Sequence, residues 1–235
     1  MINFTPAELM VATTSREIKD GEVIFAGVGI PCLGAQAAIL THAPHAEIVL
    51  ECGVFGSRAR RIILGIGDNA CGEGTKSQGA LWRAFSDMQC GRFDVGMLGG
   101  AQVDKYGNLN STAIFGNGDY RKPTARLPGS GGANDIASSA NRTILMIPLE
   151  KRKFVERVDF ITSPGYLNGG NSRKKAGLIG GGPAVVITNK AVFRFDETSK
   201  EMYLASTHPG ISVEAVKNLV SWDLKIAENV SETLP

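Results

Sequence analysis

The chain has 235 residues, of which 43% are hydrophobic and 20% charged, so it can bury one continuous core and form a single domain over residues 1–235. Its formal net charge is +2 and its basic residues are scattered, which argues against a nucleic-acid partner. No run of about 18 apolar residues predicts a membrane span. The four cysteines form no C-x-x-C pair, so we expect a cytoplasmic protein with reduced thiols and no metal site.

Apolar periodicity and glycine turns predict helices and strands that alternate along the chain. In chain order we expect a helix at 6–19, a strand at 22–31, a helix at 33–43, strands at 45–53 and 60–68, a helix at 77–91, a strand at 92–104, a glycine loop opening into a helix at 128–141, strands at 142–149 and 156–162, an antiparallel pair at 183–196 and 201–210, and a last helix at 211–220. This alternation is typical of an α/β domain with a largely parallel sheet.

One acidic residue, Glu51, ends a predicted buried strand. Three apolar residues precede it and Gly53 follows closely. In parallel sheets, ligands bind beyond the carboxyl ends of the strands, where we also expect the glycine turns 27–29, 99–102 and 129–132. A strand-end acid can also be a cap or an ion-pair partner. A carboxylate with a pKa near ~4.3 is ionised at neutral pH, however, and can act as a nucleophile without a partner base.

Other catalytic and binding motifs are weaker. GIGDNA at 65–70 matches a loose dinucleotide pattern, but Gly72 and Gly74 follow where the phosphate-binding helix should run. No G-x-S-x-G turn accompanies a histidine, so no serine triad is evident. PGSGGANDIA, from residue 128, is a better candidate. Successive small residues at a helix start can aim backbone N–H groups at an anion, although such runs are also common surface loops.

Several segments together resemble the β subunits of family I coenzyme A transferases, most closely the glutaconate CoA-transferase type. The segments are GVGIP (27–31), APHAEIVLECG (43–53), GGAQVDKYGNLNST (99–112), RLPGSGGANDIA (126–137), EKRKFVERVDFITSPGY (150–166) and VFRFDETSKEMYLASTHPG (192–210). The resemblance implies a three-layer fold with helices on both faces of the sheet, and its catalytic glutamate falls on Glu51. Cys52 stands where relatives acting on 3-oxo acids carry Asn, which favours the glutaconate-like branch.

The resemblance also implies a mechanism and a set of site residues. Glu51 would attack a CoA thioester to give an acyl-glutamyl anhydride and then a glutamyl-CoA thioester, in a ping-pong cycle. CoA thioesters are its substrates, and no further cofactor is implied. The candidates for an oxyanion or CoA-binding loop are Gly27, Gly29, Gly131 and Gly132. Those for the pocket lining are Cys52, Gly53, Gly99, Gly100 and Gln102.

The implied partner is a homologous α subunit that completes the pocket, in a heterotetramer or hetero-octamer. The acyl group is left open. Arg58, Arg60, Arg61 or Arg121 could hold a distal carboxylate, but such residues are more often solvated. Two alternatives also stay open: a CoA-thioester hydrolase, decarboxylase or ring-opening C–C hydrolase on the same fold, and a structural or ligand-sensing α/β domain. Retention of Glu51 favours the transferase.

Overall fold

The strands at the centre of the sheet are short apolar runs, rich in β-branched residues and buried on both sides, as parallel strands between two helical layers must be. The computed structural model describes residues 4–234. Its helices are α1 (Pro6–Arg16), α2 (Ile30–Thr41), α3 (Leu81–Gln89), α4 (Ala133–Ser139), α5 (Ser172–Lys175) and α6 (Val213–Lys217), with a 3₁₀ turn at Asn69–Gly72. Its strands are β1 (Val23–Phe25), β2 (Glu47–Leu50), β3 (Val54–Phe55), β4 (Ser77–Gln78), β5 (Val95–Leu98), β6 (Gln102–Val103), β7 (Leu109–Asn110), β8 (Ala113–Ile114), β9 (Ala125–Arg126), β10 (Arg142–Met146), β11 (Pro183–Ile187), β12 (Ala191–Phe195), β13 (Met202–Thr207) and β14 (Lys225–Glu232).

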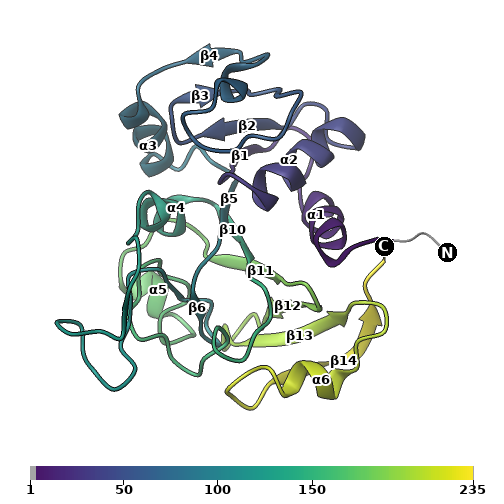
Figure 1. Cartoon of the computed structure of the whole chain (residues 1–235), viewed down its shortest axis with the longest axis vertical. Coiled ribbons are helices and arrows are strands. Elements are labelled where there is room, and N and C mark those ends of the chain that lie inside the picture. Colours follow the sequence, from purple (N-terminus) through teal and green to yellow (C-terminus); the bar gives the residue numbers. More distant parts are fainter. Residues whose placement is uncertain (1–3, 235) are drawn as a thin grey trace.

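One ten-stranded sheet connects most of these elements, in the order β14-β13-β12-β11-β10-β5-β1-β2-β3-β4. The five central strands, from β11 to β2, are mutually parallel. Towards the edges, β3 and β4 pair antiparallel on one side, and β12 and β13 on the other. The sheet runs through the molecule from β4 to β14 (Figure 1). This confirms the predicted α/β class with a largely parallel sheet.

Helices cover both faces of the sheet, and each face has its own core. Ile24 and Ile48 belong to the apolar cluster that includes residues of α1 and α2. Their neighbours Phe25 and Val49 belong to the cluster that includes residues of α3, α4 and α6. This alternation is the two-residue period of a strand. In Figure 1, α1 and α2 lie to one side of the central strands, and α3 and α4 to the other.

Helix α1 begins where its sequence predicts. Pro6 occupies the first turn, where its missing N–H removes no helical bond. Thr5 and Glu8 form a capping box: the Thr5 hydroxyl accepts from Glu8 N at 3.2 Å, and the Glu8 carboxylate accepts from Thr5 N at 2.7 Å. The helix ends at Arg16, three residues before the predicted end.

Two predicted strands are wrong. Residues 60–68 form no strand, because the Asp68 carboxylate takes the donors of a local turn, Leu64 N at 3.1 Å and Ala70 N at 2.9 Å. Residues 156–162 form no strand either. The run packs along the β6–β7 hairpin and makes isolated contacts there, such as Thr162 N to Leu109 O at 2.8 Å. The last strand, β14, was not predicted, because its sequence is largely polar and exposed.

Candidate active site

Glu51 lies at the carboxyl end of β2, at the tip of the hairpin that leads into β3. Gly53 closes this turn: its N–H donates to Leu50 O at 3.0 Å, and its carbonyl accepts from Gly79 N at 2.8 Å. Its φ is +86°, and a Cβ at this position would lie 2.3 Å from Gly79 O. Only glycine fits these two constraints together. The turn that presents Glu51 is therefore fixed by its backbone.

The carboxylate of Glu51 points towards the α3–α4 face of the sheet. Strand alternation already places Glu51 on the same side as Val49, which belongs to the core on that face. Glu51 Oε1 lies 3.6 Å from the position that a Cβ on Gly132 would occupy. Gly132 is the residue before α4, and Phe85 of α3 packs so closely that the same Cβ would lie 2.4 Å from its Cζ. A side chain at 132 would displace Phe85 and make van der Waals contact with the carboxylate.

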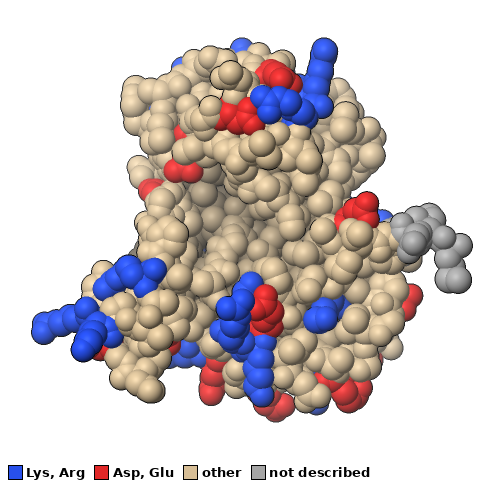
Figure 2. Space-filling view, in the orientation of Figure 1, with Lys and Arg blue, Asp and Glu red and all other residues tan. Residues whose placement is uncertain are grey.

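A cavity of about 480 Å³ opens in front of Glu51, and its lining includes residues of α2, β5 and α4. Glu51 is the one charged residue that lines it within the described chain, and the lining is otherwise mostly apolar or glycine. The hydroxyl residues are Ser111 and Ser130, and Cys71 adds a thiol. Figure 2 shows a hollow between the two halves of the molecule, with walls that are largely uncharged. In such surroundings, electrostatic interactions are stronger than in water.

The loop before α4 brings backbone donors to this cavity. Gly129 N donates to Ser111 O at 2.9 Å and Ala133 N to Ser130 O at 2.8 Å, which anchors both ends of the loop. Between them, the N–H groups of Gly131 and Gly132 have no recorded acceptor among the described residues, and both glycines line the cavity. Free backbone N–H groups of this kind can stabilise a developing oxyanion.

The structure brings about half of the predicted site residues together. Glu51, Gly27, Gly99, Gly131 and Gly132 all line the cavity. Five others, Gly29, Cys52, Gly53, Gly100 and Gln102, do not line it. Gly29 was a candidate for the oxyanion or CoA-binding loop and the other four for the pocket lining, and these assignments stay predictions.

Three of these residues, Gly29, Gly100 and Gln102, have identifiable local contacts or backbone constraints. Gly29 precedes α2 with a φ of +94°, a conformation that favours glycine. Gly100 lies beside β6–β7, where a Cβ would be 3.3 Å from Gln102 O. The Gln102 side chain accepts a hydrogen bond from Asn110 Nδ2 at 2.7 Å and another from Asp159 N at 3.1 Å. It therefore ties the β6–β7 hairpin to the 156–162 run.

Cys71 is a cavity residue that the sequence did not single out, because no spacing motif marks it. Its thiol donates to Gly65 O at 3.5 Å. Cys32 and Cys71 share the core under α1 and α2, and Cys52 packs against it. Burial raises the pKa of Cys71, helped by the neighbouring Cys52, and burial raises the pKa of Cys32 to about 11. The thiols of Cys32 and Cys71 therefore stay protonated at neutral pH, which makes them poor nucleophiles.

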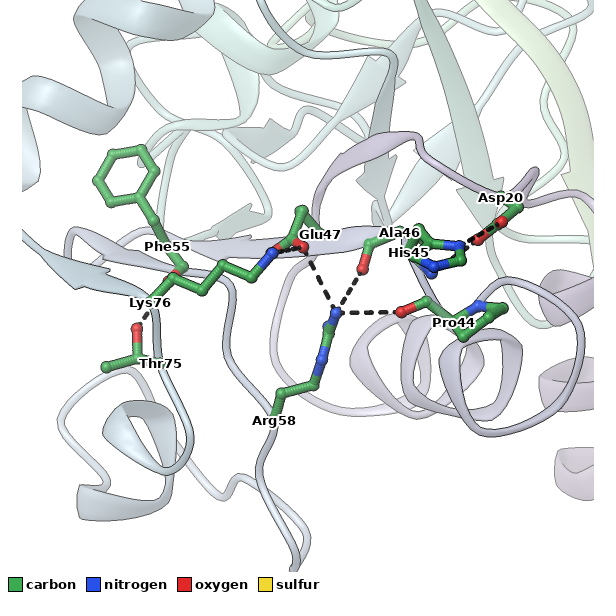
Figure 3. Close-up of polar contacts among 9 residues, drawn as sticks. All are labelled: Asp20, Pro44, His45, Ala46, Glu47, Phe55, Arg58, Thr75 and Lys76. Atoms are coloured by element: carbon green, nitrogen blue, oxygen red, sulfur yellow. Dashed lines mark hydrogen bonds and ion pairs between the residues drawn. The ribbon is translucent and has the colours of Figure 1, made fainter.

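The four arginines considered for a distal carboxylate do not line the cavity. Figure 3 shows Arg58 directed at the amino end of β2, where Nη2 donates to Ala46 O at 3.0 Å and lies 3.5 Å from Glu47. Arg61 forms a two-point pair with Asp68, at 2.6 and 3.0 Å. The cavity therefore presents hydroxyl, thiol and backbone N–H groups, but no cation from the described residues.

Residues 4–234 contain neither of two other kinds of feature, a metal-binding cluster and a membrane-spanning helix. No group of three or more His, Cys, Asp or Glu side chains is arranged to hold a metal ion. Within the same residues, no helix is both long enough and apolar enough to cross a membrane.

Comparison with known proteins identifies relatives over almost the whole chain. A family model described as coenzyme A transferase matches residues 7–219. One subunit of the 3-oxoadipate CoA-transferase of Pseudomonas knackmussii is 39% identical, over 99% of this chain and 89% of that protein. One subunit of the glutaconate CoA-transferase of Acidaminococcus fermentans is 36% identical, over 99% and 88%. The crystal structure of glutaconate coenzyme A-transferase from that organism superposes with a TM-score of 0.90, over 98% of this chain and 89% of that one.

A more distant relative carries a different activity in its name. The cholesterol ring-cleaving hydrolase IpdB subunit of Mycobacterium tuberculosis is 27% identical, over 97% of this chain and 88% of that protein. The same fold therefore occurs in proteins named for CoA transfer and for hydrolysis.

Proposed function

The chain belongs to the coenzyme A transferase family, and we propose that it is the glutamate-bearing subunit of a heteromeric CoA-transferase that moves CoA between carboxylic acids. The observation that carries this proposal is the position of Glu51. Its carboxylate is the one charged group that the described residues place in the cavity, and it lies beside the free N–H groups of Gly131 and Gly132.

The proposed reaction begins when a Glu51 carboxylate oxygen attacks the carbonyl carbon of the donor thioester. The carbon–sulfur bond breaks, CoA leaves as a thiolate, and the donor acyl group is joined to Glu51 as a mixed anhydride. The thiolate then attacks the glutamyl carbonyl of the anhydride, which releases the donor acid as a carboxylate. Glu51 now carries CoA as a thioester. The acceptor carboxylate repeats both steps in reverse, so no net water, proton or electron is consumed.

Each tetrahedral intermediate in this sequence carries an oxyanion. The N–H groups of Gly131 and Gly132 are the proposed donors, since they lie on the side of the sheet to which the Glu51 carboxylate points. They are backbone groups in an anchored loop, so little reorganisation is needed as the charge develops. The remote parts of CoA would supply binding energy that holds the reacting atoms together.

Water must be kept from both covalent intermediates, because anhydrides and thioesters hydrolyse. The apolar lining from residues such as Phe25, Met97 and Met146 supports this requirement.

The two CoA-transferase relatives are each named as one subunit of a larger enzyme, which supports an α subunit as the partner that completes the pocket. A heterotetramer or hetero-octamer stays a prediction, as does a cytoplasmic location.

The substrate class follows from the relatives and not from the cavity. Both names, 3-oxoadipate and glutaconate, are those of dicarboxylic acids, so we propose dicarboxylic acids among the substrates. No described cation lines the cavity. The second carboxylate would then be held outside the part of the pocket that this chain supplies.

The test uses the chain co-expressed with the homologous α subunit of the same genome. The complex is incubated with acetyl-CoA and either glutaconate or 3-oxoadipate, and the new acyl-CoA is measured by mass spectrometry. In a second sample, acyl-CoA alone is added and then borohydride, which reduces a glutamyl thioester to an alcohol. Reduction at Glu51, with transfer that depends on the acceptor, supports the proposal. Loss of acyl-CoA at equal rates with and without acceptor would assign the hydrolase alternative.

A further inference from the structure

One arginine, Arg173, is buried without an acidic partner. It lies in the short helix α5, next to α4 (Figure 1), and is 5% exposed. No carboxylate among residues 4–234 lies within ion-pair distance of its guanidinium. Because a buried cation without a counter-ion is costly, other groups of the chain must compensate for the charge of Arg173.

Five backbone carbonyl groups surround the guanidinium of Arg173, one for each of its five N–H donors. The acceptors are Gly180 O for Nε (2.7 Å), Pro164 O and Gly165 O for Nη1 (3.0 Å each), and Ala137 O and Ser138 O for Nη2 (2.6 and 3.1 Å). One planar group therefore joins three segments of the chain, namely the end of α4, the turn at 164–165 and the turn at 180.

The bonds from Nη2 of Arg173 go to the carboxyl end of α4. The last carbonyl groups of a helix have no partner within it, and a cation is the favourable group beside them. Gly180 packs against the same end: its N–H donates to Ser138 O at 2.8 Å, and a Cβ on it would lie 2.3 Å from Ala140 O. The end of α4 is therefore held by Arg173 and by the turn that Arg173 also binds.

The first turn of α4 is tied to the same guanidinium through the segment 162–165. Asn134 Nδ2 donates to Thr162 O at 3.0 Å, and Arg173 binds the carbonyl groups of the next residues, Pro164 and Gly165. Helix α4 has seven residues and is about 10 Å long. Arg173 therefore fixes its carboxyl end directly and its first turn through one short segment.

The side of α4 that faces the sheet is also closely seated. Ile136 packs on Gly96 of β5, where a Cβ would lie 2.4 Å from Ile136 Cγ2. Close-packed interiors transmit displacements because they leave little free volume. A shift of α4 would therefore carry with it Gly132, the residue before its first turn, and change the distance between the loop and Glu51.

We propose that Arg173 is a positioning residue of the active site: by fixing both ends of α4, it holds the N–H groups of Gly131 and Gly132 beside the Glu51 carboxylate. This inference rests on the proposed function, in which those N–H groups stabilise the oxyanion. Arg173 does not line the cavity, so it acts on the reaction through α4. Its loss should lower kcat more than it raises KM, because the oxyanion forms only after the substrate has bound.

The test compares Arg173→Gln and Arg173→Lys in the complex with the α subunit, well below the melting temperature of each variant. Gln removes the charge and three of the five donors, whereas Lys keeps the charge and three donors. Arg173→Gln should lower kcat about tenfold to a hundredfold, with KM within about threefold of the parent. Arg173→Lys should recover part of this rate. Hydrogen exchange of the complex without substrate should be faster in Arg173→Gln at amides 131–138.

The matched control is Arg142→Gln. Arg142 is a partly buried arginine at the start of β10, where it donates to the Glu22 carboxylate at 2.7 Å and to Glu17 O at 2.8 Å, and it does not line the cavity. Its loss should lower the melting temperature but leave kcat within about twofold of the parent and exchange at 131–138 unchanged. A kcat for Arg173→Gln equal to that of Arg142→Gln, or unchanged exchange at 131–138 in Arg173→Gln, would overturn the proposal.

A further variant, Asn134→Ala, keeps the proposal testable if Arg173→Gln does not fold. Asn134 is exposed, so the fold should be retained, and the change removes only the bond to Thr162 O. It should lower kcat about threefold to tenfold with little change in KM. Combined with Arg173→Lys, it should lower kcat by less than the product of the two single effects, because both changes loosen one link. Multiplicative losses would contradict a shared role.

The two readouts separate this inference from the proposed function. A parent complex that transfers no CoA would sink the proposed function, while hydrogen exchange at 131–138 would still decide whether Arg173 fixes α4. An active parent complex in which Arg173→Gln behaves like Arg142→Gln would leave the proposed function standing and overturn the role of Arg173.

Discussion

Glu51 and Gly132 are 81 positions apart in the sequence, yet a Cβ at Gly132 would lie 3.6 Å from Glu51 Oε1. The contact joins the end of β2 to the start of α4, two elements that the sheet places at the same edge. It puts a proposed nucleophile beside a loop with free N–H groups. Substitutions at Glu51 and at Gly132 separate the roles of these two residues.

Replacement of Glu51 tests the nucleophile. Glu51→Gln is nearly isosteric but cannot form the anhydride, so we expect transfer to fall by at least ~10³-fold, with CoA binding retained. Glu51→Asp keeps the carboxylate but withdraws it by one methylene, which leaves room for water. It should lose transfer more than hydrolysis. Both activities are measured on the α-subunit complex, and an unchanged ratio in Glu51→Asp would contradict this account.

Replacement of Gly132 tests the close approach at the carboxylate. In Gly132→Ala, the new Cβ would lie 2.4 Å from Phe85 Cζ, so the ring or the loop must move. We expect kcat to fall about tenfold to a hundredfold, since small displacements in a reacting site have effects of this size. The double variant Gly132→Ala with Phe85→Leu removes the clash and should recover much of the rate. No recovery would place the defect elsewhere in the loop.

Whether a site residue can be predicted from the sequence depends on whether its interactions are with neighbours along the chain or with distant segments. Glu51 could be predicted because a local pattern marks it: apolar residues of a strand, then an acid, then glycine. Cys71 and Phe85 could not, because they reach the site through the packing of segments that no local pattern relates. Gln102 follows Gly100 closely in the chain, but its side chain is recruited by Asn110 and Asp159. Proximity along the chain therefore predicts which segments lie near the cavity, but it does not predict which residues line it.

The same distinction between local patterns and distant contacts explains which strands were predicted wrongly. The core strands were predicted because burial on both faces demands apolar runs, which β2 and β5 show. Residues 60–68 are also apolar, yet Ile62 and Leu64 are exposed. The Asp68 carboxylate closes a local turn through Leu64 N and Ala70 N, so this apolar run stays outside the sheet. Strand β14 is polar because it lies at the sheet edge, and an edge strand needs little apolar sequence.

The turn that presents Glu51 allows a stability prediction with a matched control. Gly53→Ala meets two costs, a left-handed φ of +86° and a contact 2.3 Å from Gly79 O. Gly21→Ala meets only the first, because φ is +82° and nothing lies within 4 Å of its Cβ. We expect Gly21→Ala to lower the free energy of unfolding by about 1 kcal/mol, and Gly53→Ala by about 2 kcal/mol or more. Equal losses in urea titrations would show that the Gly79 contact relaxes freely.

Buried His208 should make the fold sensitive to mild acid. Its side chain is 3% exposed; Nε2–H donates to Thr188 O at 2.8 Å, and Nδ1 has no recorded partner among the described residues. Burial lowers its pKa below 6.5, although the bond to Thr188 opposes the shift. The unfolded chain, with a histidine pKa near ~6.5, therefore takes up the proton first as the pH falls. Stability is fully present above that value and is lost as the pH drops towards the folded pKa.

The measurement for His208 is the free energy of unfolding between pH 8 and pH 5.5, for the parent and for His208→Gln, which keeps a donor for Thr188. The variant should be less stable at pH 8 but should lose less stability on acidification, since at most one proton, about 1.4 kcal/mol per pH unit, is removed from the linkage. Asp104 acts in the opposite direction, because burial raises its pKa and its contribution grows as the pH falls. That residue is common to both proteins, so the difference between the two curves isolates His208. Parallel curves over the whole range would mean that His208 stays neutral in both the folded and unfolded chain or titrates equally in both, and the predicted effect of burial would then be wrong.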